Sequence, residues 1–284
     1  MPPIYSKNGT CNPHSGGSWW TLMLSLPFAG AFLVSGRLPL LWPGGGKWWY
    51  LFPPVSESHP QNPVFIQRMF GKIAQRYDLA NHVLSLGMDY SWRRRIAKLV
   101  AQKQPRLILD LATGSGDLAL ELAKYSPQAE VVAADFCLPM LEQAKRKNVP
   151  NLTGADGTRL PFAEGTFDAL TVAFGLRNMA SYETAIREFL RVLKPGGELF
   201  ILDFSMPGSL LRPAYRLYLR HILPHLAGWL TGEKAAYDYL GESIEAFPNG
   251  EAMTALIARR GGKAATATEL AGGIVSLYRA EKAT

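Results

Sequence analysis

The stretch from Leu107 to Asp117 constrains this chain more than any other, because an apolar run leads directly into two closely spaced glycines. The run predicts a buried strand, and Gly114 and Gly116 predict a tight turn that lets the backbone approach a ligand. Apolar residues at helical spacing begin at Leu118, so the free N–H groups at the start of a helix would face the same ligand. A nucleotide-like cofactor fits this arrangement, and an ordinary strand-to-helix connection fits it equally well.

Strands and helices alternate on both sides of this turn. The sequence predicts strands at 106–112, 130–134, 151–154, 168–173 and 197–203, separated by helices at 117–125, 138–147 and 182–193. Such alternation is typical of an α/β fold, with a mostly parallel sheet and helices on both faces. Two further strands, at 264–268 and 273–279, bring the expected sheet to seven strands. Ligands bind such sheets at the carboxyl ends of the strands.

Helical segments flank the alternating core. Apolar residues at helical spacing and a stop at Gly87 predict a helical cap over 63–104, before the core at 105–205. After residue 205 the alternation ends, and 206–262 is expected to be a mostly helical lid interrupted by prolines. The final strands then occupy 263–284. The predicted domain is therefore 63–284.

The first 62 residues differ from the rest, since they hold nine of the twenty prolines and five of the seven tryptophans. Their apolar run from Trp19 to Val34 is short for a membrane-spanning helix, which needs about 20 apolar residues. Three interpretations stay open: a membrane-touching anchor, a cleaved targeting segment, and translated upstream sequence. We favour a disordered or artefactual extension.

Composition excludes several classes of protein. The net charge of +7 is mild for a nucleic-acid-binding protein and fits an anionic membrane surface or an acidic ligand better. Two cysteines, Cys11 and Cys137, imply no disulfide framework and a reducing compartment. We expect both to be unreactive, and no metal site is predicted.

Two acidic residues after the turn indicate what the ligand is. Asp135 ends the second strand about 20 residues beyond the glycines, where a carboxylate can accept both ribose hydroxyls of a nucleoside. A helix N-cap is the structural alternative for the same residue. Asp156 and Gly157 follow the third strand and can present a carboxylate to an adenine amino group. These features alone do not separate a nicotinamide dinucleotide from S-adenosylmethionine.

The chain resembles class I S-adenosylmethionine-dependent methyltransferases over about residues 100–205. Over about 63–280 it is similar to the ubiquinone/menaquinone biosynthesis C-methyltransferases, and the motifs that carry this likeness lie at 76–81, 85–87, 174–178, 191–207 and 239–248. The family usually has Thr at Ser115 and Glu at Asp203. It commonly has Met at Ala80, and His-Arg at Asp89-Tyr90.

The resemblance implies a fold, a cofactor and a set of cofactor contacts. The fold is Rossmann-like, and the cofactor is S-adenosyl-L-methionine. The cofactor-binding residues expected from the turn and from the resemblance are Asp110, Gly114, Ser115, Gly116, Asp135, Asp156 and Gly157.

The reaction implied by the resemblance is methylation of a ring carbon of a prenylated quinol. Loss of a phenolic proton makes that carbon nucleophilic, and a phenol titrates near pH 10, so the site has to stabilise the phenolate. Arg177 is expected to do so electrostatically and to hold a water that accepts the proton, while Asn178 orients the oxygen. Tyr77 and Asp78 on the cap would close the cleft from the other side. A buried Arg–Asp pair joining cap to core is the structural alternative.

The sequence leaves three alternatives to demethylmenaquinol methylation. One is methylation of a polyprenyl methoxy-benzoquinol in ubiquinone biosynthesis, which no motif here separates from a naphthoquinol substrate. Another is a non-catalytic subunit of a quinone-synthesis complex. The third is a nicotinamide-dependent oxidoreductase, which would need a second nucleotide-binding half after residue 168.

The expected lid contains a segment at 209–230 with Arg212, Arg216 and Arg220 spaced four residues apart beside a broad apolar face. This pattern predicts peripheral contact with an anionic membrane, from which a polyprenyl substrate would be drawn. Solvated arginines on a helix packed against the sheet explain it equally well. We expect a cytoplasmic protein at the inner face of the cell membrane that contacts no nucleic acid, and we leave a homodimer open.

Overall fold

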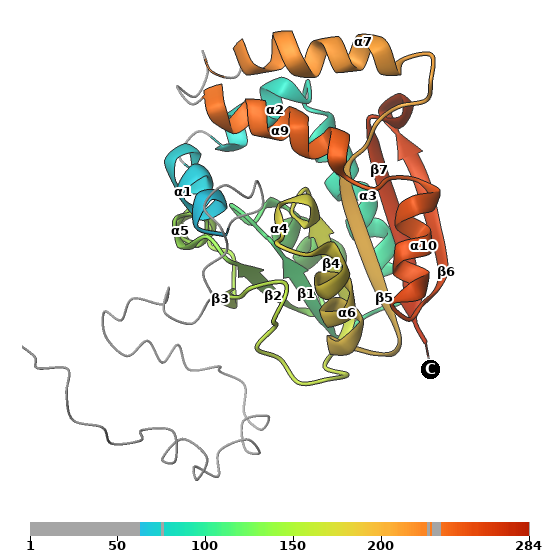
Figure 1. The fold of residues 1–284 in the computed structure, drawn as a ribbon. Coiled ribbons are helices and arrows are strands. Elements are labelled where there is room, and N and C mark those ends of the chain that lie inside the picture. The colour runs from blue at the N-terminus through green and yellow to red at the C-terminus, as the bar shows by residue number, and fades with distance from the viewer. Residues whose placement is uncertain (1–62, 75–76, 226–227, 229–233, 284) are drawn as a thin grey trace, which may run out of the picture. The chain divides into compact units, whose positions relative to one another are not determined.

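A computed structural model describes residues 63–74, 77–225, 228 and 234–283 (Figure 1). The predicted N-terminal extension at 1–62 lies outside these residues. Within the described part of the chain, the helical cap, the alternating core, the helical lid and the final strands follow one another in the expected order.

A seven-stranded mixed sheet organises the core, as expected. Its strands lie in the order β3-β2-β1-β4-β5-β7-β6, and all neighbours are parallel except the last two pairs, in which β7 runs antiparallel to β5 and to β6. The strands are β1 (Leu107–Leu111), β2 (Glu130–Asp135), β3 (Leu152–Gly154), β4 (Phe167–Ala173), β5 (Leu193–Phe204), β6 (Gly262–Leu270) and β7 (Val275–Lys282).

Helices cover both faces of this sheet because side chains alternate along each strand. Ile108 of β1 belongs to a core shared with α3 (Met88–Ala101) and α4 (Asp117–Tyr125). Its neighbour Leu109 belongs to a second core, shared with α6 (Tyr182–Val192) and α10 (Glu251–Arg259). The edge helix α5 (Leu138–Arg146) contributes Ala144 to the first core. The sheet is therefore buried between two helical layers (Figure 1).

Cap and lid share a third core, although more than a hundred residues separate them in the sequence. Ile66 and Met69 of α1 (Pro63–Ile73) pack with Leu219 of η4 (Tyr218–Ile222) and with Tyr239 of α9 (Lys234–Ala246). The remaining elements of this region are α2 (Tyr77–Leu84) and α7 (Arg212–Leu217). Figure 1 shows α7, α9 and α2 together at the end of the sheet where the parallel strands terminate.

One predicted boundary was wrong. The helix predicted over 182–193 ends at Val192, and β5 begins at Leu193, four residues before the predicted strand at 197–203. The first part of β5 contains a bulge, because Phe167 pairs with Leu193 and Ala169 pairs next with Glu198. The bulge directs Lys194 towards Asp168, with Nζ 2.6 Å from Oδ1.

Candidate active site

A cleft of about 810 Å³, including its open mouth, lies at the carboxyl ends of β1, β2 and β4. A smaller hollow of about 360 Å³ adjoins it, since both are lined by Ala112, Gly114, Ala173 and Phe174. The predicted residues that line the cleft are Gly114, Asp135, Asp156, Gly157 and Asn178. The smaller hollow is lined by Asp110 and Ser115 among others.

The glycine turn takes a backbone path that requires small residues. Gly114 and Gly116 have φ of 58° and 87°, in the left-handed region that favours glycine. A Cβ on Gly116 would also lie 2.3 Å from Cγ2 of Val149. Gly116 is the N-cap of α4, so the turn places the start of this helix beside the cleft.

Asp110 supports this turn from beneath and does not line the main cleft. Its side chain is buried, and it accepts hydrogen bonds from the Thr113 hydroxyl at 2.6 Å and from the Thr171 hydroxyl at 2.7 Å. Burial raises the pKa of Asp110 to about 6. Its role in cofactor binding stays a prediction, and the contacts assign it to holding the turn.

Asp135 ties the end of β2 to two neighbouring segments of backbone. Its Oδ2 accepts a hydrogen bond from the backbone N–H of Gly114 at 2.8 Å, which connects it to the glycine turn. Its Oδ1 accepts from the N–H of Cys137 at 2.7 Å, but the N-cap of α5 is Cys137 itself, so Asp135 supports the start of this helix without being its N-cap. Burial raises the pKa of Asp135, and the ribose contact stays a prediction.

The far end of the cleft is narrow and largely apolar. Asp156 is held by Thr158, whose N–H and hydroxyl both donate to Oδ1 at 2.8 Å. A Cβ on Gly157 would lie 2.6 Å from Sδ of Met179, so the Met179 side chain packs directly against the backbone at this position. Burial raises the pKa of the Cys137 thiol in the same wall to about 12, which agrees with the expectation of an unreactive cysteine.

Arg177 and Asn178 form the short helix η3 (Leu176–Asn178) directly after β4. Nη1 of Arg177 donates to Oδ1 of Asp203 at 2.5 Å and to the carbonyl oxygen of Phe174 at 2.9 Å. The Phe204 ring lies 5.2 Å from the guanidinium carbon. A buried Arg–Asp pair is thus present, but it joins β4 to β5 within the core and not the cap to the core.

The lid supplies a residue that the sequence did not single out. Tyr239 of α9 donates its hydroxyl to Oδ1 of Asn178 at 3.3 Å, while Nδ2 of Asn178 contacts the Phe174 carbonyl at 3.3 Å. Burial raises the pKa of Tyr239 to about 12, so its hydroxyl stays protonated near neutral pH. Its place in the 239–248 motif was the available signal, but nothing in that motif indicated its partner.

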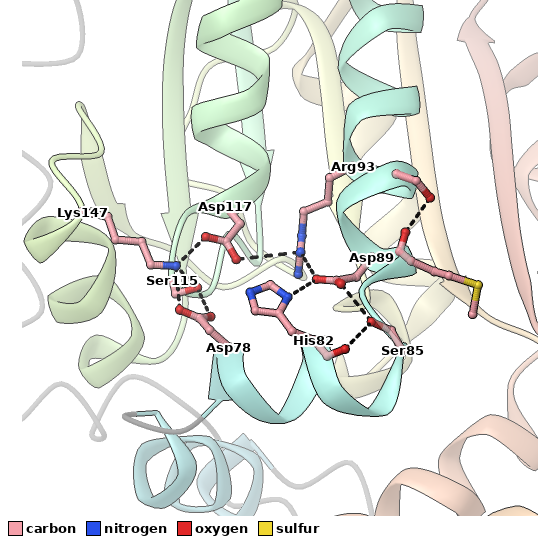
Figure 2. Close-up of polar contacts among 10 residues, drawn as sticks. Asp78, His82, Ser85, Asp89, Arg93, Ser115, Asp117 and Lys147 are labelled. Atoms are coloured by element: carbon pink, nitrogen blue, oxygen red, sulfur yellow. Dashed lines mark hydrogen bonds and ion pairs between the residues drawn. The ribbon is translucent and has the colours of Figure 1, made fainter.

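Asp78 of α2 lies at the glycine turn, where Figure 2 shows it facing Ser115 and Lys147. The Ser115 hydroxyl donates to Oδ1 of Asp78 at 2.5 Å, and Nζ of Lys147 lies 2.6 Å from Oδ2. Cap and core are therefore joined by Asp78 and Lys147. No motif in the sequence indicated Lys147. Tyr77 begins the same helix, and its side chain lies outside the described residues.

The strand order, with a cleft at the carboxyl ends of the parallel strands and β7 antiparallel to both of its neighbours, defines a class I methyltransferase fold. A solved S-adenosylmethionine-dependent methyltransferase from Thermotoga maritima is similar in fold, with a TM-score of 0.56 and 16% identity, over 76% of this chain and 99% of that one.

Family-level comparison is more specific. The model of the ubiE/COQ5 methyltransferase family matches residues 57–282. A demethylmenaquinone methyltransferase of Thermus thermophilus is 50% identical over 199 residues, which are 68% of this chain and 90% of that protein. A ubiquinone/menaquinone biosynthesis C-methyltransferase of Syntrophotalea carbinolica is 44% identical, over 74% of this chain and 91% of that protein. The chain belongs to the ubiE/COQ5 family and is an S-adenosylmethionine-dependent methyltransferase.

The residues present fit this cofactor. A nucleoside needs a carboxylate at the end of β2 and a narrow apolar slot, and Asp135 and the wall at Gly157 provide both. The amino-acid end needs polar groups near the glycine turn. The smaller hollow supplies these from Ser115, Asp117 and Arg93.

Proposed function

We propose that this enzyme methylates a ring carbon of a prenylated quinol, converting demethylmenaquinol to menaquinol. The observation that carries the proposal is the position of Arg177 and Asn178, at the end of the strand whose carboxyl end borders the cofactor cleft. The names of the Thermus thermophilus relative and of similar proteins from Deinococcus radiodurans and Mycobacterium tuberculosis support the choice of quinol.

The proposed chemistry requires an electron-rich ring carbon. Bound S-adenosylmethionine supplies an electrophilic methyl group. Arg177 remains protonated, so it serves as a fixed positive charge that favours the phenolate and holds the water that accepts the phenolic proton. Asn178 lines the cleft, and its amide, fixed by Tyr239, orients the quinol oxygen.

The surroundings of this pair suit a hydrophobic substrate. Aromatic residues surround the region of Arg177. Phe204 comes from β5, and the lid contributes Tyr215, Tyr218 and Tyr239. Burial raises the pKa of Tyr215, which excludes it as a base near neutral pH. An apolar enclosure keeps bulk water out and strengthens the electrostatic effect of Arg177 on the phenolate.

Peripheral contact with a membrane is part of the proposal. Exposed apolar side chains of the lid, more than its arginines, would make this contact. Arg216 and Arg220 lie 3.4 Å and 2.9 Å from Oε2 of Glu245 on α9, so these two pair with a neighbouring lid helix, whereas the alternative interpretation expected solvated arginines. Apolar side chains remain exposed on the same segment. Leu210 is 91% exposed, and Leu217 and Ile222 exceed half. No helix among the described residues is long and apolar enough to span a membrane.

The central test is an assay of the purified chain with labelled S-adenosylmethionine. Demethylmenaquinol and a polyprenyl methoxy-benzoquinol are offered separately, and we expect the naphthoquinol to accept the label. If only the benzoquinol accepts the label, the substrate is the alternative one, a polyprenyl methoxy-benzoquinol. Failure to bind S-adenosylmethionine in calorimetry would favour a non-catalytic subunit.

The membrane contact is tested by co-sedimentation with anionic liposomes. We expect Leu210→Ser combined with Leu217→Ser to reduce binding, because exposed leucines at a bilayer surface contribute buried apolar area. Charge reversal at Arg212, Arg216 and Arg220 should reduce it further. If neither the leucine substitutions nor the charge reversals affect liposome binding, the proposed membrane contact of this segment is wrong.

A further inference from the structure

The hydroxyl group of Ser115 has one hydrogen to donate, and in this structure it donates it to Asp78. Ser115 is buried, at 3% exposure, in the turn that lines the cofactor site. A ligand that needs this hydrogen has to displace the Asp78 carboxylate first. The cap residue and the cofactor therefore compete for the same donor.

Lys147 reinforces this competition. It follows α5, and its Nζ lies 2.6 Å from Asp78 Oδ2 and 3.1 Å from Ser115 Oγ, with a further ion pair to Asp117 (Figure 2). Partial burial works to lower the pKa of Lys147, but hydrogen bonds to Asp117 and Asp78 outweigh this effect and raise it. The serine hydroxyl and the ammonium group together form a binding site for one carboxylate, and Asp78 occupies it.

The other end of α2 is anchored differently. His82 Nδ1 lies 2.7 Å from Oδ2 of Asp89, and the Ser85 hydroxyl donates to Oδ1 of Asp89 at 2.8 Å. Asp89 is 2% exposed and also pairs with Arg93 on α3. Loss of the Asp78 contacts would therefore free the N-terminal end of α2 and leave its C-terminal end attached to α3.

The smaller hollow also contains a carboxylate, Asp117, that could bind the ammonium group of an amino acid. Asp117 Oδ2 faces this region, is buried, and has no hydrogen-bond partner among the described residues; Nη1 of Arg93 lies 3.8 Å away. A ligand that carries both a carboxylate and an ammonium group would satisfy Ser115, Lys147 and Asp117 at once. S-adenosylmethionine carries both groups on its methionine end.

We propose that Asp78 is an internal substitute for the methionine carboxylate of the cofactor, and that binding of S-adenosylmethionine displaces it from Ser115 and Lys147. Lys147 and Asp117 then hold the carboxylate and the ammonium group, respectively. The displaced end of α2, which carries Tyr77 and Asp78, becomes available to close over the second substrate. The enzyme thereby binds its cofactor before its quinol. This inference rests on the cofactor and not on the identity of the quinol.

The first test measures binding by calorimetry with two probes. S-adenosylhomocysteine has the amino-acid end, and 5′-methylthioadenosine lacks it. Asp78→Ala removes the competitor, so S-adenosylhomocysteine should bind at least about fivefold tighter, the low end of measured coupling between sites. Its affinity for 5′-methylthioadenosine should stay unchanged. Weaker binding of S-adenosylhomocysteine to this variant would overturn the proposal, because Asp78 would then be a direct ligand of the cofactor.

The second test removes the cation. Lys147→Met should weaken S-adenosylhomocysteine binding by about tenfold, the effect of one lost charge-assisted hydrogen bond, and leave 5′-methylthioadenosine unaffected. Lys145→Met is the matched control, since Lys145 is exposed two residues earlier. Equal affinities in the Lys147 and Lys145 variants would contradict the proposal.

A third measurement needs no variant. Hydrogen exchange of the α2 amides in the unmodified protein should become faster at the N-terminal end when S-adenosylhomocysteine is added, and should not respond to 5′-methylthioadenosine. Added protection of the same amides would overturn the displacement. If these results hold while no quinol is methylated, the proposed substrate fails and the displacement stands.

Discussion

The cofactor side of the active site and its proposed quinol side are built in different ways. The cofactor side consists of turns that directly follow β1, β2 and β3, and short polar contacts such as Asp135 to Gly114 connect them. The quinol side is assembled from β4, β5, the lid and the cap, and its central contacts join residues 26 and 61 positions apart. The turns of the cofactor side can therefore be recognised from the strands that precede them, whereas the quinol side depends on correct packing of the lid.

The largest effect is expected at Arg177. Arg177→Ala should lower quinol turnover by at least about a hundredfold, as removal of a charge-stabilising donor does. It should also cost about 3–5 kcal/mol of the free energy of unfolding, because Asp203 is left buried without its partner. The affinity for S-adenosylmethionine should stay nearly unchanged, since Arg177 does not line the cofactor cleft. The labelled-methyl assay, urea unfolding and calorimetry measure these three quantities in turn.

A double variant separates the two roles of Arg177. Arg177→Met with Asp203→Leu replaces the buried ion pair by apolar side chains, so most of the stability should return while turnover stays lost. Comparable loss of cofactor binding in either variant would sink the assignment of Arg177 to the quinol side.

A glycine pair tests how rigid the cofactor side is. Gly116→Ala introduces a Cβ 2.3 Å from Val149 Cγ2 at φ of 87°, which should cost about 1–3 kcal/mol for overpacking in addition to the backbone strain. Gly87→Ala is the control, with φ of 72° and nothing within 4 Å of the added atom. The difference between the two in urea unfolding gives the packing contribution alone. Equal losses would show that the turn can move away from α5.

The pH dependence of stability tests the support beneath the turn. Burial raises the pKa of Asp110 to about 6, so the folded protein binds a proton that the unfolded chain releases near pH 4. The contribution of Asp110 to stability is therefore greatest below pH 4 and falls as pH rises to about 6. Its size is about 3 kcal/mol for a shift of roughly two pH units.

Asp110→Asn removes this titration. Relative to the unmodified protein, the variant should gain stability by up to about 3 kcal/mol between pH 4 and pH 7, measured by urea unfolding at several pH values. Parallel stability curves for the two proteins would contradict the raised pKa of Asp110.

The smallest effect is expected at the surface of the lid. Glu245→Gln removes the ion pairs to Arg216 and Arg220, whose side chains are 47% and 61% exposed. Such pairs contribute about 0–1 kcal/mol, so unfolding should change little. Liposome binding should rise slightly as two positive charges are freed. A large loss of stability would show that the lid is a more integral part of the fold than the exposure of these arginines indicates.

The same contrast explains what the sequence could predict. The strand-turn-helix unit at Gly114, Asp135 at the end of β2 and the number of strands follow from local periodicity and spacing, and they are confirmed. The pairing of Asp78 with Lys147 and of Tyr239 with Asn178 could not be predicted, because each depends on where a helix packs against the sheet. Arg177 was identified by motif, but its partner Asp203 lies on the neighbouring strand.

The antiparallel pairing of β5 with β7 has a consequence for how this enzyme can diversify. Phe204 at the end of β5 pairs with Val275 at the start of β7, and β6 pairs with the other side of β7, so the sheet holds the segment between Phe204 and Gly262 as one long connection. Lengthening such a connection costs little, about 0.6 kcal/mol for each doubling. Insertions and deletions there leave the register of the sheet and the glycine turn untouched. A chain of this design can exchange one acceptor for another while it keeps the same methyl donor.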